Sequence, residues 1–200
     1  MTQAKSVYCL AALAILSLGV GVADANGPIQ WATSEGGNDH YYEYIPYIGK
    51  ATTLWEDAML AAQALEHLGN EGYLASILSE EEGLWILDEL FPTEAQRTPW
   101  SAWIGAFRDD TGSPWEWVSS EPWGSYEPWT PGVVPMEPGD AVYAAFTYRG
   151  LPDWWGSWNG VEPDEEYLVS GFIVEYVPEP ATISLLAIGG LLGLRRRRHC

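Results

Sequence analysis

The stretch WIGAFRDDTGSPWEWV, residues 103–118, is the most informative part of this chain for its fold. Its two ends, WIGA and WEWV, carry the aromatic and β-branched residues that favour strands. The segment RDDTG between them has the Asp, Thr and Gly residues that are typical of turns. The stretch therefore predicts two strands joined by a turn.

The residues before this stretch predict two further strands and a helix. Residues 40–45 and 73–77 are rich in aromatic and β-branched residues, which indicates strands. Residues 53–68 carry apolar side chains at helical spacing. Thr53, with a glutamate three residues later, forms a capping box, and Gly69 ends the predicted helix.

A second helix is predicted to begin after Ser79, a good N-cap residue. Three glutamates follow it, where the helix dipole favours acidic side chains. Pro92 would end this helix, and its apolar face is expected to consist of Leu84, Leu87, Leu90 and Phe91.

The residues after the opening stretch predict strands around a long loop. Residues 119–140 consist mainly of Pro, Gly, Trp, Ser and Glu, and a loop of this length inside a domain is usually functional. Residues 141–148 and 168–176 predict strands, and residues 149–163 predict a Trp-rich turn region. The element order is therefore β-α-β-α, followed by strands.

Short motifs spread over this region resemble, in order, those of a C-type lectin-like domain. They are HYYE at 40–43, WEDA at 55–58, LASI at 74–77, SEEE at 79–82, WIGA at 103–106, WEWV at 115–118, WTPG at 129–132, WNG at 158–160 and GFIVEY at 171–176. The resemblance implies an α+β fold of the C-type lectin-like type, in which two helices flank small antiparallel sheets beside a long loop region. It assigns residues 26–177 to this domain. It also implies core positions for Trp55, Trp103, Trp115, Trp117 and Trp158.

In sugar-binding members the resemblance implies a calcium ion that bridges the protein and two sugar hydroxyls. Among its ligands, the Glu-Pro-Asn motif falls on Val134, Pro135 and Met136, and the final Asn-Asp pair falls on Asn159 and Gly160. Calcium needs about six to eight oxygen ligands, so a site that keeps only the asparagine is not expected to hold it. We therefore expect no cofactor, and no calcium at the usual position.

Disulfide bonds are not expected in the domain either. The family cysteines fall on Ala141 and Val174, and the two cysteines of the chain, Cys9 and Cys200, lie near its ends. A domain of about 150 residues can bury enough surface to fold without a crosslink.

Two groups of loop residues are candidate ligand contacts. The aromatic group lies among Pro and Gly residues and consists of Trp123, Trp129, Trp154 and Trp155. The polar group supplies acceptors for hydroxyl hydrogens and consists of Glu137, Asp140, Asp153 and Asn159. An exposed indole ring can stack on the apolar face of a sugar while such acceptors bind its hydroxyls. The alternatives are loop packing for the tryptophans and a relocated cation site for the polar group.

The other polar residues are expected to be structural. Residues 80–82 indicate a helix start and residues 164–166 a solvated face. His40 and His67 are isolated, without metal-ligand spacing. The sequence has no nucleophile elbow, phosphate loop or zinc pattern. Glycoside hydrolysis needs only two acids at a set separation, and nothing singles out a pair, so no enzymatic activity is expected.

Both ends of the chain indicate export. Residues 1–25 combine Lys5, an apolar run and an Ala-Asp-Ala triplet, which predict a signal peptide, with a retained membrane helix as the alternative. At the other end Pro178, Glu179 and Pro180 precede an apolar segment, and the cluster that follows consists of Arg195, Arg196, Arg197 and Arg198. This order resembles the PEP-CTERM sorting signal of Gram-negative bacteria.

The second resemblance implies that an exosortase recognises residues 178–200 and removes them during export, in organisms that make extracellular polysaccharide. The apolar segment, residues 181–194, is shorter than the roughly 20 residues that a membrane-spanning helix needs. Transient membrane contact through this tail is therefore expected, and an uncleaved anchor is the alternative. The expected location is the outer surface or the extracellular matrix.

Charge narrows the choice of partner. Residues 26–177 have 26 acidic and four basic residues, so their net charge is −22. Nucleic acids require a basic surface and are excluded as partners. The sequence thus predicts an exported, non-catalytic binding module for carbohydrate or an exopolysaccharide matrix. The alternative is a structural or adhesive domain that binds protein at the cell surface and has no sugar ligand.

Overall fold

A computed structural model describes residues 27–47, 54–93, 101–110, 112–130, 142–147, 156–161 and 169–178. The helices are α1 (Trp55–Gln63), α2 (Glu80–Leu90) and a short 3-10 helix, η1 (Thr33–Glu35). The strands are β1 (Ile29–Gln30), β2 (Tyr41–Pro46), β3 (Glu66–His67), β4 (Asn70–Leu74), β5 (Ser101–Arg108), β6 (Glu116–Trp117), β7 (Val142–Thr147), β8 (Ser157–Val161) and β9 (Val169–Tyr176). The predicted signal peptide and nearly all of the predicted tail lie outside these residues.

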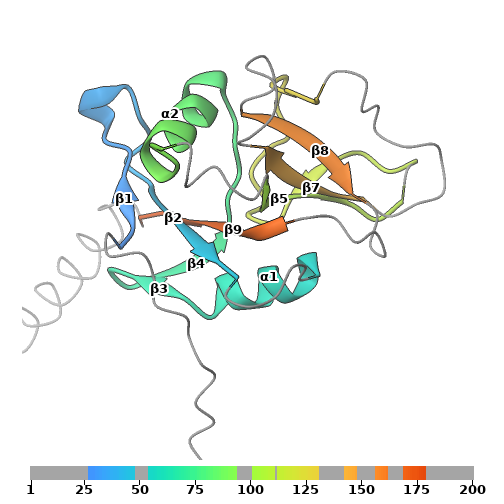
Figure 1. Cartoon of the computed structure of the whole chain (residues 1–200), viewed down its shortest axis with the longest axis horizontal. Helices are drawn as coiled ribbons and strands as arrows, with labels where there is room; N and C mark the ends of the chain where they lie inside the picture. Colours follow the sequence, from blue (N-terminus) through green and yellow to red (C-terminus); the bar gives the residue numbers. More distant parts are fainter. Residues whose placement is uncertain are drawn as a thin grey trace, which may run out of the picture.

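The strands form one mixed sheet whose main order is β1-β2-β9-β5-β7-β8. β9 pairs with β2 and β4 in antiparallel fashion and with β5 in parallel fashion. The parallel pair corrects the prediction of small antiparallel sheets, because it joins the two halves of the domain into a continuous sheet. Figure 1 shows α1 and α2 on opposite sides of β2, β4 and β9.

Each face of the sheet has its own hydrophobic core. Alternate residues of β9 point to opposite faces. Phe172 and Val174 therefore pack with Trp55 of α1, whereas Ile173 packs with Leu87 of α2. Every residue of β9 is buried, so this strand is the centre of the domain.

Gly105 explains why the WIGA motif needs a glycine. A Cβ atom at this position would lie 2.4 Å from the carbonyl oxygen of Leu74. The backbone N–H of Gly105 donates to the carbonyl of Ala75 at 2.9 Å, and its carbonyl accepts from Val118 at 3.0 Å. The two strands predicted from the opening stretch are confirmed as β5 and β6. At Gly105, β5 lies directly against Leu74 and Ala75, where β4 ends.

The first helix is shorter than predicted. It ends at Gln63, and a β3–β4 hairpin replaces its expected last turn. Leu68 and Gly69 have φ values of 52° and 85°, so they form the left-handed turn of the hairpin rather than continuing the helix. The strand predicted at residues 73–77 consequently lies earlier, at Asn70–Leu74. The predicted N-cap was wrong as well, because the helix is preceded by Leu54, which makes no side-chain cap bond.

The second helix begins as predicted, since Ser79 accepts a hydrogen bond from the N–H of Glu82 at 3.1 Å. Its predicted apolar face is wrong at Leu84, which is 47% exposed, while Ile86 is fully buried.

β8 is a further correction, because it lies in the region predicted as a Trp-rich turn. It forms by pairing with β7 in antiparallel fashion. Among the described residues, no helix is long and apolar enough to cross a membrane.

Candidate functional site

A cluster of aromatic rings lies where the loop after β6 crosses β8. Trp158 of β8 is fully buried at its centre. Four rings meet it edge-on, with centroids 5.4–5.8 Å away, and they belong to Trp117, Trp123, Tyr126 and Trp129. Trp115 contacts Trp129 at 4.7 Å, and the Arg108 guanidinium lies 5.0 Å above the Trp115 ring. The cluster holds the loop against the sheet.

Backbone hydrogen bonds fix the same loop segment along β8. The N–H of Trp158 donates to the carbonyl of Pro128, and the N–H of Thr130 donates to the carbonyl of Trp158, both at 2.8 Å. The Oγ1 atom of Thr130 lies 2.8 Å from Oγ of Ser157. Residues 128–130 are therefore held beside β8.

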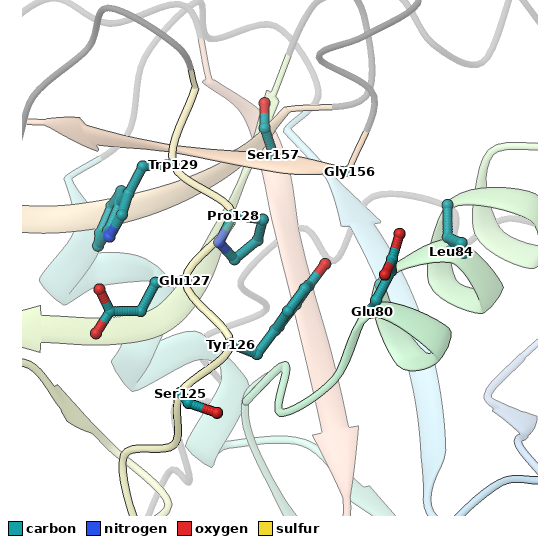
Figure 2. Close-up of a pocket in the computed structure, with 10 residues that line it drawn as sticks. Glu80, Leu84, Ser125, Tyr126, Glu127, Pro128, Trp129, Gly156 and Ser157 are labelled. Atoms are coloured by element: carbon teal, nitrogen blue, oxygen red, sulfur yellow. The ribbon is translucent and has the colours of Figure 1, made fainter.

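A pocket of about 450 Å³ lies between this segment and the start of α2. Its lining residues are Glu80, Gly83, Leu84, Ser125, Tyr126, Glu127, Pro128, Trp129, Gly156 and Ser157. Figure 2 shows the rings of Tyr126 and Pro128 on the side of the segment that faces α2, where Glu80 and Leu84 lie. The side chains of Glu127 and Trp129 point to the other side of the segment. Tyr126 is therefore the aromatic ring that the pocket offers to a ligand.

The electrostatic environment of the pocket is negative. Burial and, after it, the charges of Glu80, Glu81 and Glu82 together raise the pKa of the Tyr126 hydroxyl to about 12. The lining residues include no Lys or Arg. Arg108, the nearby cation of the aromatic cluster, lies over Trp115 instead.

Of the predicted aromatic contacts, the structure describes Trp123 and Trp129. Both are half-buried. Trp123 stacks against Trp117 at 4.9 Å, and its Nε1 donates to Glu127 at 2.7 Å. These two tryptophans pack in the loop and remain partly exposed, which agrees with the loop-packing alternative, and their contact with a ligand stays a prediction. Trp154 and Trp155 lie outside the described residues.

Of the predicted polar group, the structure describes only Asn159. This side chain is 8% exposed in β8, and its Nδ2 donates to Oγ1 of Thr147 at 3.0 Å. It lies opposite Ala145 of β7, so it forms part of the sheet rather than of an open loop. Glu137, Asp140 and Asp153 lie outside the described residues, as do Val134, Pro135 and Met136.

A second polar site lies beneath α2, and the sequence interpretation missed it. Glu82 was assigned only to a helix start, but its side chain is buried, with 2% of it exposed. The Tyr42 hydroxyl donates to it, and the N–H of Leu78 donates to its Oε2 at 2.6 Å. Burial raises the pKa of Glu82 to about 7. Through the Tyr42 bond, the Glu82 carboxyl links α2 to β2 of the central sheet.

Glu175 of β9 forms the other half of this site. Its Oε1 lies 2.6 Å from Nδ1 of His40, and its Oε2 accepts from the N–H of Ser76 at 2.9 Å. Burial alone would lower the pKa of His40, but its hydrogen bond to Glu175 and the carboxylate charge outweigh this effect, and the pKa is raised. His40 was predicted to be isolated, but it contacts Glu175 in the fold, and its structural role stays a prediction.

One group of described residues could hold a metal ion. Ligand atoms of His40, Glu121 and Glu175 lie within 4.8 Å of one another. One imidazole nitrogen and two carboxylates are ligands suited to zinc and similar divalent ions. His40 was predicted to lack metal-ligand spacing, and its partners are far away along the chain, so only folding brings the group together.

The pocket was likewise missed. Tyr126 and Pro128 belong to the loop flagged by its length and composition, whereas Glu80 and Leu84 were assigned to a helix start and a helix core. The SYEPW stretch at 125–129, with its aromatic residues around a proline, was the available signal.

Comparison with known proteins agrees with both resemblances. The model of the PEP-CTERM protein-sorting motif matches residues 177–198. Rat (Rattus norvegicus) lithostathine is 29% identical over 133 residues, which cover 66% of this chain and 76% of lithostathine. Halomucin of Haloquadratum walsbyi is 30% identical over 142 residues, but these span 65% of this chain and only 1% of Halomucin.

Solved structures show the fold. The C-type lectin CEL-I from Cucumaria echinata matches with a TM-score of 0.52 at 17% identity, covering 70% of this chain and 92% of CEL-I. Human lithostathine matches with a TM-score of 0.53 at 22% identity, covering 71% of this chain and 86% of lithostathine. The protein therefore has the C-type lectin-like fold, followed by a PEP-CTERM sorting motif that marks it for export.

Proposed function

We propose that this protein is an exported, non-catalytic binding module for carbohydrate, and that it binds sugar without the calcium bridge used by sugar-binding relatives. The pocket between Tyr126 and the start of α2 carries the proposal. Its volume of about 450 Å³ falls within the range of roughly 300–1,000 Å³ that is usual for small-molecule sites. A sugar ring fits such a space, because its apolar face can cover an aromatic ring while its hydroxyls reach polar groups.

The groups around the pocket offer both kinds of contact. The ring of Tyr126 and the side chains of Pro128 and Leu84 are apolar, and Leu84 is 47% exposed. Ser125, Ser157 and Glu80 offer oxygen atoms to sugar hydroxyls. The aromatic cluster behind the segment supports preorganisation, since a rigid site loses less entropy when it binds.

Binding without calcium is supported by the position of Asn159. It alone among the family ligand positions keeps a suitable side chain, and its amide group bonds within the sheet to Thr147. A single amide is far below the six to eight oxygen ligands that calcium takes. The natural ligand would be an oligosaccharide or the exopolysaccharide matrix around the exporting cell.

A glycan array with the exported domain, read with calcium and with a chelator, tests the proposal. We expect binding that is equal in the two conditions and is lost in Tyr126→Ala. Tyr73→Ala is the matched control, because Tyr73 is also half-buried but lies on β4, in the hairpin away from the pocket. The absence of a glycan signal would refute the proposal. A signal that requires calcium would refute its mechanism.

The second candidate is a structural or adhesive domain that binds protein at the cell surface. It is favoured by two exposed leucines of α1: Leu54, at its N-cap, is 56% exposed, and Leu60, within the helix, is 60% exposed. Apolar side chains at such exposure suit a protein contact more than a sugar contact. If this candidate is right, Leu60→Glu releases the protein from the cell surface or matrix, and Tyr126→Ala does not.

A further inference from the structure

We infer that the pocket beside Tyr126 prefers sugars that carry a protonated amine, such as glucosamine units, over N-acetylated or acidic sugars. This inference rests on the proposed carbohydrate function and specifies its ligand class. It follows from the charges on the wall of the pocket that α2 provides.

The first turn of α2 would by itself attract an anion. Its free N–H groups and the helix dipole are equivalent to about half a positive charge. Here, however, Ser79 caps the N–H of Glu82, and the turn carries Glu80, Glu81 and Glu82. Glu80 and Glu81 are both exposed, and Glu80 lines the pocket. Even with Glu82 partly protonated, the negative charge of this turn exceeds the dipole about fourfold.

After burial, the charges of Glu80, Glu81 and Glu82 are what raise the pKa of Tyr126. The same three glutamates that raise it also disfavour any anion placed beside the ring. A uronate or sulfated sugar would therefore meet repulsion, and no Lys or Arg among the lining residues offsets it. An ammonium group would be attracted both by the carboxylates and by the face of the Tyr126 ring.

The geometry places the two attractive groups together. Figure 2 shows Tyr126 and Glu80 on the same side of the segment, with Pro128 beside the ring. A pyranose ring that covers Tyr126 could thus direct a substituent toward Glu80. An ammonium group there forms an ion pair with the Glu80 carboxylate, whereas an acetamide N–H donates a hydrogen bond to it without a positive charge.

Calorimetric titration with matched trisaccharides tests this inference. The three ligands are β-1,4-linked glucosamine, its N-acetylated counterpart and a galacturonate trimer, at mildly acidic pH and low salt. We expect the free amine to bind about fivefold more tightly than the acetylated sugar, which is the effect of one exposed ion pair. The uronate should bind most weakly, and added salt should reduce the preference for the amine.

Glu80→Gln should abolish this preference, so that the amine and the acetylated trisaccharide bind with about equal affinity. Glu71→Gln is the matched control, because it removes the same charge from an exposed position on β4. If both variants lost the amine preference to the same extent, only the overall charge of the protein would matter, and the inference would be overturned. Equal binding of amine and acetylated sugars, lost in Tyr126→Ala, would overturn the amine preference and leave the carbohydrate function standing. No binding of any trimer overturns the inference, and the glycan array then decides the function separately.

Discussion

The Nδ1 atom of His40 lies 2.6 Å from Oε1 of Glu175. His40 directly precedes β2 and Glu175 lies in β9, so the pair links these two segments. His40 is 17% exposed at its side chain and Glu175 only 1%. A buried carboxylate is costly unless its charge is compensated and its oxygens are bonded. His40 and the N–H of Ser76 meet these needs. Through the Ser76 bond, Glu175 also links β9 to the segment that leads into α2.

Protonation of this buried site predicts a stability that depends on pH. Glu82 ionises near pH 7 in the folded chain, compared with an ordinary value of about 4.3 when unfolded. Between these values the folded state holds the extra proton, so the free energy of unfolding falls as pH rises. His40 acts in the same direction, because its raised pKa stabilises the fold at low pH and the effect is lost as pH rises through that value. We expect a decrease of about 1–2 kcal/mol between pH 5 and pH 7.

Urea denaturation over this pH range measures the effect. Glu82→Gln removes the titrating carboxyl and should flatten the dependence. Glu89→Gln, an exposed position on the same helix, should leave it unchanged. A free energy of unfolding that rises from pH 5 to pH 7 would contradict the prediction, as would an unchanged slope in Glu82→Gln.

Gly105→Ala is expected to destabilise the domain. The added methyl group would approach the Leu74 carbonyl oxygen to 2.4 Å, and backbone on both sides would have to shift. Overpacking of this kind costs about 1–3 kcal/mol. Thermal and urea unfolding measure the loss. Gly124→Ala is the matched control, because the nearest atom to its new Cβ would be 4.0 Å away. Equal stability of the two variants would contradict the close contact at Gly105.

Calcium is expected to leave the melting temperature unchanged relative to the same concentration of magnesium. A specific ion would raise it by mass action, and Asn159 alone cannot hold one at the usual position. A calcium-specific increase would contradict the expectation, and two variants would locate the ion. Loss of the increase in Asn159→Ala places it at the family position. Loss in Glu121→Gln places it with His40 and Glu175.

Removal of residues 178–200 should abolish sorting. The deletion removes all but one residue of the segment that matches the sorting motif. We expect the shortened protein to be exported without tail processing and to lose its normal retention, as measured by mass spectrometry and cell fractionation. Cys200→Ser is the control, because that residue lies beyond the matched segment. Unchanged processing and retention of the shortened protein would count against a sorting role.

Much of the fold could be predicted from the sequence, because its strongest signals are local. The Ser79 cap and the helix after it depend on neighbouring residues, and they appear where predicted. The WIGA, WEWV and GFIVEY motifs also fall on strands, with the exposed residues Asp109, Asp110 and Gly112 between the first two. The errors concern contacts that sequence spacing does not report. Leu68 has the right spacing for a helix face, but a hairpin between β3 and β4 places it in an exposed turn.

The candidate sites were harder to predict, because their residues come from distant segments. Glu80 and Tyr126 line one pocket although helix and loop patterns assign them to separate elements. Glu82 lies in an acidic run that predicts exposure, yet the turn of α2 directs it inward to Tyr42. Side-chain direction at a helix start depends on what the helix packs against, which the local sequence does not contain.

The sequence by itself determined the alternation of strands and helices in the first half of the domain, the sorting motif and the mismatch with the usual calcium ligands, since these depend on residue type and local spacing. Only the tertiary structure decided that Trp123 and Trp129 pack around Trp158, that Tyr126 faces the pocket and that Glu175 is buried beside His40. The physical reason is that β9 pairs with β2, β4 and β5, strands from distant parts of the chain, and these long-range pairings set which side chains meet.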